Sequence, residues 1–262
     1  MLYNFYNKFM NNNYDILIDG TNFSISNGIY DIITSDCFYF GYIKNNKPNI
    51  SGFINHIIPH LAKYREDLHL QFLKNNNYDE DVARLIERNI YNVYLKTFDI
   101  SNDSKRKIQL RINKENESSF REILYKHLNK YNFDFTNYIR TLLLDYSIKP
   151  LYQREYFSIY SLSKKIEYAI QLCREIVIKT RSESINLIPI TYEVDSTTAQ
   201  SFLFGFTSSS KDVITVLKYS EIQNIIVLDK SHTPTQEDYN FIIDSIQKFF
   251  NDLNTNNNGE QK

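Results

Sequence analysis

One run of eight residues, Lys105-Arg106-Lys107-Ile108-Gln109-Leu110-Arg111-Ile112, carries side chains that could bind a partner. Lys107, Gln109 and Arg111 alternate with Ile108, Leu110 and Ile112. This two-residue period is typical of a β-strand with one buried face. The other face would display an ammonium, a carboxamide and a guanidinium in a row. Two explanations stand side by side: the polar groups contact a partner, or they are the solvated face of an edge strand.

Two helices are expected after this strand. The first covers about Lys114–Leu128, and the second covers Asn137–Ser147. The stretch Phe133-Asp134-Phe135-Thr136 has the apolar residues and the hydroxyl of a staple and an N-cap, so Thr136 is expected to cap the second helix.

The strand followed by two helices resembles the ribbon-helix-helix DNA-binding module over about Lys105–Tyr146. In that family two strands pair antiparallel across a two-fold axis and enter the major groove of DNA. The resemblance makes Lys107, Gln109 and Arg111 the base-reading residues, with Lys107 and Arg111 suited to guanine and Gln109 to adenine. It also implies a phosphate at the start of the second helix, near Thr136, Asn137 and Arg140.

The strand needs a partner, because a single strand leaves a row of unpaired backbone groups. A second chain could supply it, and this is the basis for expecting a homodimer. The aromatic segment Phe38–Lys44 could supply it instead, since the helix that starts near Ser51 could belong to a degenerate second copy of the module. Such a pseudo-dimer would read DNA asymmetrically.

The C-terminal half predicts a long helix over about Glu155–Leu172 and then a series of short strands. Strands at this spacing favour a small barrel. A helix should follow from Thr235, with Thr233-Pro234-Thr235-Gln236 supplying a cap and a capping-box Gln. The five expected strands are Ile176–Lys179, Leu187–Val194, Ser201–Phe206, Val213–Tyr219 and Ile222–Leu228.

This part resembles the WYL domain, an Sm/SH3-like barrel of bacterial transcriptional regulators. The family's Trp-Tyr-Leu signature falls on Ser201-Phe202-Leu203. The resemblance implies a pocket for a nucleotide or nucleic-acid ligand at Tyr192, Phe202 and Lys218. The family's arginine-rich run falls on residues 215–222, where Lys218 keeps a positive charge and Glu221 reverses one. An anionic ligand would therefore find fewer donors here than in the family.

Composition narrows the function classes. The chain has 262 residues, with 30 Lys and Arg against 31 Asp and Glu, so any nucleic-acid surface must be a local patch. No Walker loop, Rossmann fingerprint, nucleophile elbow or paired-carboxylate signature occurs, and His56 and His60 lack a third metal ligand nearby. We therefore expect no catalysis, no cofactor and no metal. No secretory or membrane segment is recognisable, which favours a cytoplasmic protein.

These observations predict an α+β chain in which a ribbon-helix-helix-like unit precedes a WYL-like Sm/SH3-like barrel with flanking helices. The function expected is that of a sequence-specific regulator of transcription that binds double-stranded DNA as a homodimer. The alternatives are a single-stranded nucleic-acid-binding or phage-defence-associated WYL module, and a protein–protein interaction module. The expected divisions are an N-terminal α/β section at 1–100, the ribbon unit at 101–150, the WYL-like domain at 151–253 and a disordered tail at 254–262.

Overall fold

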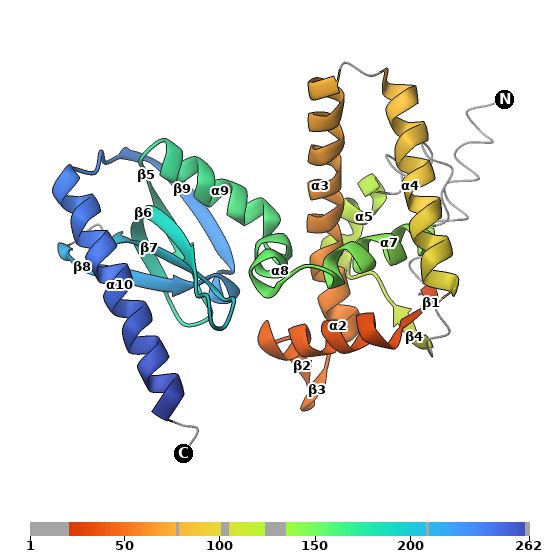
Figure 1. Ribbon diagram of the computed structural model, residues 1–262, viewed down its shortest axis with the longest axis horizontal. Coiled ribbons are helices and arrows are strands. Elements are labelled where there is room, and N and C mark those ends of the chain that lie inside the picture. The colour runs from red at the N-terminus through yellow and green to blue at the C-terminus, as the bar shows by residue number, and fades with distance from the viewer. Residues whose placement is uncertain (1–20, 77–78, 101–104, 124–134, 208–209, 260–262) are drawn as a thin grey trace. The chain divides into compact units, whose positions relative to one another are not determined.

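The protein is an α+β chain that divides into two compact units, Met1–Lys149 and Pro150–Lys262. The structure, a computed structural model, describes residues 21–76, 79–100, 105–123, 135–207 and 210–259 (Figure 1). The expected sections 1–100 and 101–150 thus fall together in the first unit. The two units are described separately below.

The first unit contains two strand–helix–helix series, one after the other. The first series is β1 (Thr21–Ser26), α2 (Asn27–Tyr39) and α3 (Ile50–Asn76), with a short hairpin of β2 (Ile43–Lys44) and β3 (Lys47–Pro48) between the helices. After α4 (Glu80–Ile100), the second series is β4 (Lys105–Leu110), a 3-10 turn η1 (Lys114–Asn116), α5 (Glu117–Ile123) and α7 (Phe135–Ser147).

The expected strand exists as β4, and its partner is β1 of the same chain. The two pair antiparallel over six residues, from Thr21 opposite Leu110 to Ser26 opposite Lys105 (Figure 1). Two expectations were therefore wrong. This ribbon needs no second chain, and its partner is not Phe38–Lys44, because most of that segment ends α2 or forms the turn after it. Ser26 serves as the N-cap of α2, its hydroxyl accepting from the Ile29 amide at 3.4 Å, so the strand passes directly into the helix.

The core of the first unit lies between the ribbon and the helices. Phe23, Ile25, Ile108 and Leu110 are buried on one ribbon face. They lie with the buried apolar faces of α3 and α7, which contact β4 and β1 respectively. Helix α3 continues through Pro59 without interruption.

Polar groups lock these helices together. Asp36 of α2 accepts a hydrogen bond of 2.7 Å from the Tyr146 hydroxyl of α7. Arg65 of α3 forms an ion pair with Asp145 and donates to the Thr141 hydroxyl at 2.9 Å, both on α7. Because buried polar groups without partners cost free energy, these pairings fix which helix faces meet.

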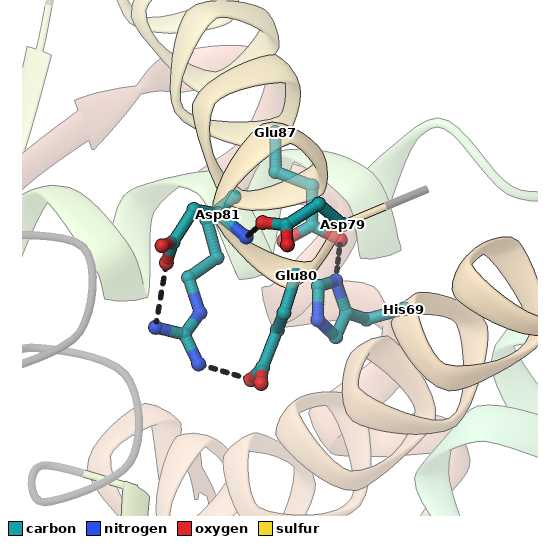
Figure 2. A network of polar contacts seen from close by, with 6 residues as sticks. His69, Asp79, Glu80, Asp81 and Glu87 are labelled. Atoms are coloured by element: carbon teal, nitrogen blue, oxygen red, sulfur yellow. Dashed lines mark hydrogen bonds and ion pairs between the residues drawn. The ribbon is translucent and has the colours of Figure 1, made fainter. Parts of the chain in front are cut away.

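Another polar network joins α3 to the start of α4 (Figure 2). His69 Nδ1 lies 2.7 Å from a carboxylate oxygen of Glu87, and the Asp79 carboxylate accepts from the Asp81 amide at 2.8 Å. Arg84 forms ion pairs with Glu80 and Asp81 one turn earlier on α4. The His69–Glu87 contact joins α4 to α3, and the other contacts stabilise the first turn of α4 itself. The apolar side chains of Val82 and Leu85 on α4 remain exposed.

The second unit is an antiparallel five-stranded sheet in the order β8-β7-β6-β5-β9, preceded by α8 (Leu151–Ser158) and α9 (Tyr160–Gln171). The backbone leaves the helical conformation at Ile159, which separates α8 from α9, where a single helix was expected. The strands are β5 (Arg174–Lys179), β6 (Ser184–Val194), β7 (Ser201–Thr207), β8 (Ser210–Lys218) and β9 (Asn224–Ser231), and α10 (Gln236–Gly259) follows.

The sheet has helices on both faces. Ile166 and Ala169 of α9 pack with Leu203 on one face. On the other face Phe202 and Phe204 pack against Phe249 and Phe250 of α10. Within the described residues the sheet is open, because β9 pairs with β5 and not with β8. The closed barrel expected from the sequence is therefore not confirmed, although all five strands are.

The last helix differs from expectation at both ends. Its capping residues are Thr235 and Asp238, which exchange hydrogen bonds of 2.7 and 3.2 Å, and not Thr233 with Gln236. Asp238 at the third helical position can accept from the cap amide, as a capping box requires. The helix continues to Gly259, so the disordered tail expected from Asn254 is wrong over residues 254–259.

Candidate nucleic-acid interface

The outer face of the ribbon carries the residues that the sequence singled out. In antiparallel pairing, residues directly opposite one another point to the same face. Gln109 therefore shares the outer face with Asn22, Lys107 with Ser24, and Lys105 with Ser26. On β4 all three side chains are exposed; on β1 Asn22 is exposed, while both serines are half-buried. The face is polar throughout and its charge comes from β4.

Its charge is concentrated. Residues 105–114 contain five cationic side chains and no acidic one, while β1 contains no charged residue at all. Arg106 points to the other face and Lys114 lies beyond the ribbon, so the outer row has Lys105, Lys107 and Arg111 at alternate positions, all exposed. This is the local positive patch that a chain of net charge −1 would need to bind a polyanion.

Arg106 points to the other face of the same strand. Its Nε donates to the Asn27 carboxamide oxygen at 3.2 Å, and its guanidinium lies 5.7 Å from the ring centroid of Tyr30. Both partners belong to α2, so Arg106 ties the strand to the helix.

Arg111 lies one residue beyond β4, with its side chain exposed and its backbone held by α3. The side-chain Nδ2 of Asn55 donates to the Arg111 carbonyl at 2.7 Å, and its side-chain Oδ1 accepts from the Asn113 backbone amide at 3.0 Å. The Arg111 amide in turn donates to the Ser51 hydroxyl at 3.4 Å. Asn55 is almost fully buried. The end of β4 is therefore clamped to the N-terminal part of α3.

The three residues expected to contact phosphate lie at the start of α7. The sequence predicted that Thr136 precedes this helix as its cap. The helix instead begins at Phe135, so Thr136 lies in its first turn. Arg140 donates to the Ser24 carbonyl of β1 at 3.0 Å and to the Asn137 side-chain oxygen at 3.1 Å. The structure thus brings Asn137 and Arg140 together beside the ribbon. Each ribbon strand is braced by the long helix of the other series, β4 by α3 and β1 by α7.

The three residues that the WYL resemblance implied for a ligand do not converge. Phe202 is opposite Lys218 on one neighbouring strand and Glu193 on the other, whereas Tyr192 is opposite Leu203. Tyr192 therefore faces the other side of the sheet from Phe202 and Lys218. Phe202 is buried against α10, and the ring of Tyr192 lies 5.9 Å from that of Tyr219.

The histidine pair of α3 is a packing feature. The rings of His56 and His60 are 5.2 Å apart, and burial together with the charge of His56 lowers the pKa of His60 to about 3. Within the described ranges no three His, Cys, Asp or Glu side chains gather in a way that could hold a metal ion. Among the described helices, none has the length and apolar character needed to cross a bilayer.

Sequence reasoning missed β1 and with it Asn22 and Ser24. The signal was present, because Phe23 and Ile25 alternate with Asn22, Ser24 and Ser26 in the same two-residue period as β4.

Comparison with known proteins finds a likeness in structure and none in sequence. No protein-family model matches the chain, and no curated protein matches it. A solved structure titled "Crystal structure of a CRISPR Cas-related protein" is similar, with a TM-score of 0.57 and 15% sequence identity. The likeness covers 84% of this chain and 66% of the other, so this chain spans slightly under two thirds of that protein's length. At this identity the likeness shows a shared fold.

Proposed function

We propose that the β1–β4 ribbon binds double-stranded DNA sequence-specifically, with its outer face in the major groove, and that the chain regulates transcription by this binding. The observation that carries the proposal is the exposure of Lys105, Lys107 and Gln109 in a row on a two-stranded ribbon whose other face buries four apolar side chains, Phe23, Ile25, Ile108 and Leu110. The major groove is wide enough for such a ribbon. The role consists of binding and includes no catalytic step.

The side chains suit base edges in that groove. An arginine or lysine can donate to O6 and N7 of guanine, and a glutamine can both donate to and accept from adenine. Lys107 and Arg111 would take the first role and Gln109 the second. Asn55 binds the backbone on both sides of Ile112, so the main-chain atoms that carry the Arg111 side chain are held in place.

The helix that begins at Phe135 supports a phosphate contact beside the ribbon. Amides in the first turn of a helix and the positive end of its dipole attract anions. Thr136 and Asn137 lie in that turn of α7. Arg140 holds the turn to β1 through the Ser24 carbonyl, so a phosphate bound there would be in fixed register with the ribbon.

The likeness to a CRISPR Cas-related protein supports a nucleic-acid-related role in that kind of defence system. It agrees equally with the alternative of a module that binds single strands. The outer face favours a duplex, because its residues are hydrogen-bonding groups without an aromatic ring, and single strands are held largely by stacking on aromatic side chains.

The test replaces Lys107, Gln109 and Arg111 together by alanine. A matched control replaces three exposed residues of the second unit by alanine, namely Lys179, Arg181 and Gln223. This change removes the same two positive charges and one carboxamide. Binding to duplexes selected by the unaltered chain and to random duplexes is measured by fluorescence anisotropy across a salt series.

We expect the ribbon variant to lose its preference for selected over random duplexes. The slope of log K against log salt should change far less than this preference, because Lys107 and Arg111 are assigned to base edges and not to phosphates. The control variant should keep both. A ribbon variant that retains its preference, or an unaltered chain that binds single strands of the same length more tightly than duplexes, would contradict the proposal.

A further inference from the structure

We infer that one chain is a complete reading unit, that its target sequence has a direction and is not a palindrome, and that Asn22 is a specificity-determining residue of β1. The inference rests on the proposed function, because it concerns what the same ribbon reads. It follows from two features of the ribbon: its closure within one chain and the unequal side chains of its two strands.

The ribbon is complete without a second copy. All six residues of β4 pair with β1, and this sheet has no further strand among the described residues. Both strands are held from within the same unit, β1 at Ser24 by Arg140 and the end of β4 at Arg111 by Asn55. A second copy is not needed to pair with the inner edge of β4, because β1 of the same chain already occupies that edge along all six residues. One chain can therefore present the whole face.

The two strands present unequal side chains. In each outward pair a long group from β4 lies opposite a short one from β1, as in Lys107 with Ser24 and Lys105 with Ser26. The Ser26 hydroxyl is already used as the cap of α2. A ribbon made from two identical chains would show the same groups at both ends, and this one does not.

The order of groups along the ribbon gives it a direction. At one end lie Arg111 and the opposed carboxamides Gln109 and Asn22, whose Cβ atoms are about 5 Å apart in such a pair. Carboxamides and guanidinium groups make two-pronged hydrogen bonds to adenine and guanine. At the other end Lys107 and Lys105 offer single ammonium groups, which suit phosphate or one acceptor. Base reading is therefore concentrated at the Arg111 end.

The length of the face sets the size of the target. Six residues at about 3.3 Å each span about 20 Å, which is about six base pairs of B-form DNA. The target should contain adjacent adenines and a guanine within one half of these six pairs, with weaker preference in the other half.

The experiment selects bound sequences from random duplexes with the unaltered chain, an Asn22→Ala variant and an Asn186→Ala control. Asn186 is also an exposed strand asparagine, but it belongs to β6 of the second unit. Native mass spectrometry of the complex with the selected duplex gives the number of chains bound. Circular dichroism confirms that the variants keep the fold.

We expect the unaltered chain to select a directional sequence and to bind it as one chain per duplex. Asn22→Ala should lose about 5- to 100-fold of its discrimination at one position of that sequence, and Asn186→Ala should lose none. Selection of a palindrome bound by two chains would overturn the inference and leave the proposed function standing. Retention of full discrimination by Asn22→Ala would overturn the role of that residue. Failure to select any duplex would overturn both the inference and the proposed function.

Discussion

Replacing Asn55 by alanine should loosen the end of β4 and lower the stability of the first unit. The side chain makes two hydrogen bonds to the segment after β4, one with the Arg111 carbonyl at 2.7 Å and one with the Asn113 amide at 3.0 Å. An unmade buried hydrogen bond costs about 1–3 kcal/mol. Arg111 and Asn113 are exposed residues, so water can reach their backbone groups in part, and the lower figure applies to each. We therefore expect a loss of about 2 kcal/mol.

Two measurements check this value. For a unit of this size, 1 kcal/mol corresponds to a change of about 2–4 °C in melting temperature, so Asn55→Ala should lower the Tm by about 4–8 °C. Hydrogen exchange at the Asn113 amide should also accelerate, because that amide loses its acceptor. The control is Asn76→Ala, since Asn76 is exposed at the end of the same helix and its side chain donates to the Phe72 carbonyl one turn earlier. It should change stability by less than about 0.5 kcal/mol. The clamp would be refuted if both variants melted together and exchange at Asn113 did not change.

Three further results are expected. The pKa of His60 is lowered to about 3 from an unfolded value of 6.5, so the unfolded chain binds a proton more readily than the folded chain. The free energy of unfolding should therefore fall by up to about 1.4 kcal/mol per pH unit as the pH drops below 6.5. His60→Gln should flatten this slope, as measured by urea titrations between about pH 6.5 and 4.5. Equal slopes would contradict a neutral His60 imidazole in the folded chain. Burial and a neighbouring carboxylate raise the pKa of Cys37 to about 12, so a thiol reagent at pH 8 should label Cys173 and leave Cys37 unlabelled until unfolding, as read by peptide mass spectrometry. A Cβ on Gly205 would lie 2.3 Å from a main-chain oxygen of β6, so Gly205→Ala should lower the free energy of unfolding by about 1–3 kcal/mol. A Cβ on Gly28 would have nothing within 4 Å, so Gly28→Ala should leave stability unchanged. Equal melting temperatures for the two variants would contradict this packing.

The sequence predicted elements whose pattern is strong and local. The alternation around Gln109 marked β4, and the five strands of the second unit were each recognisable by their two-residue period. These signals come from the residues themselves, because a half-buried strand must alternate wherever it lies in the sheet.

Pairing between distant segments could not be predicted in the same way. Three helices separate β1 (Thr21–Ser26) from β4 (Lys105–Leu110) in the chain. The residues of neither strand indicate which other segment it pairs with. The same holds for β9, which returns to pair with β5. Of the candidate site, the sequence supplied the β4 half and the residues at the start of α7, but the Asn22 half depended on this long-range pairing.

The faces of helices and sheets depended on tertiary structure as well. Tyr192 and Phe202 looked equally available in the sequence, and only the register of β6 against β7 puts them on opposite faces. Conversely, Val82 and Leu85 of α4 have the spacing of a core stripe and remain exposed. Apolar residues at helical spacing indicate an amphipathic helix, but they do not show which element, if any, packs against its apolar face.

Dimethyl sulfate interference on a selected duplex tests the central claim most directly, because the reagent methylates guanine N7 in the major groove and adenine N3 in the minor groove. If the outer face of the ribbon enters the major groove, N7 methylation should block binding at guanines within about six base pairs, towards one end of that stretch, and N3 methylation there should have little effect. Interference by N3 methylation alone, or equal binding of methylated and unmethylated duplexes, would contradict the account.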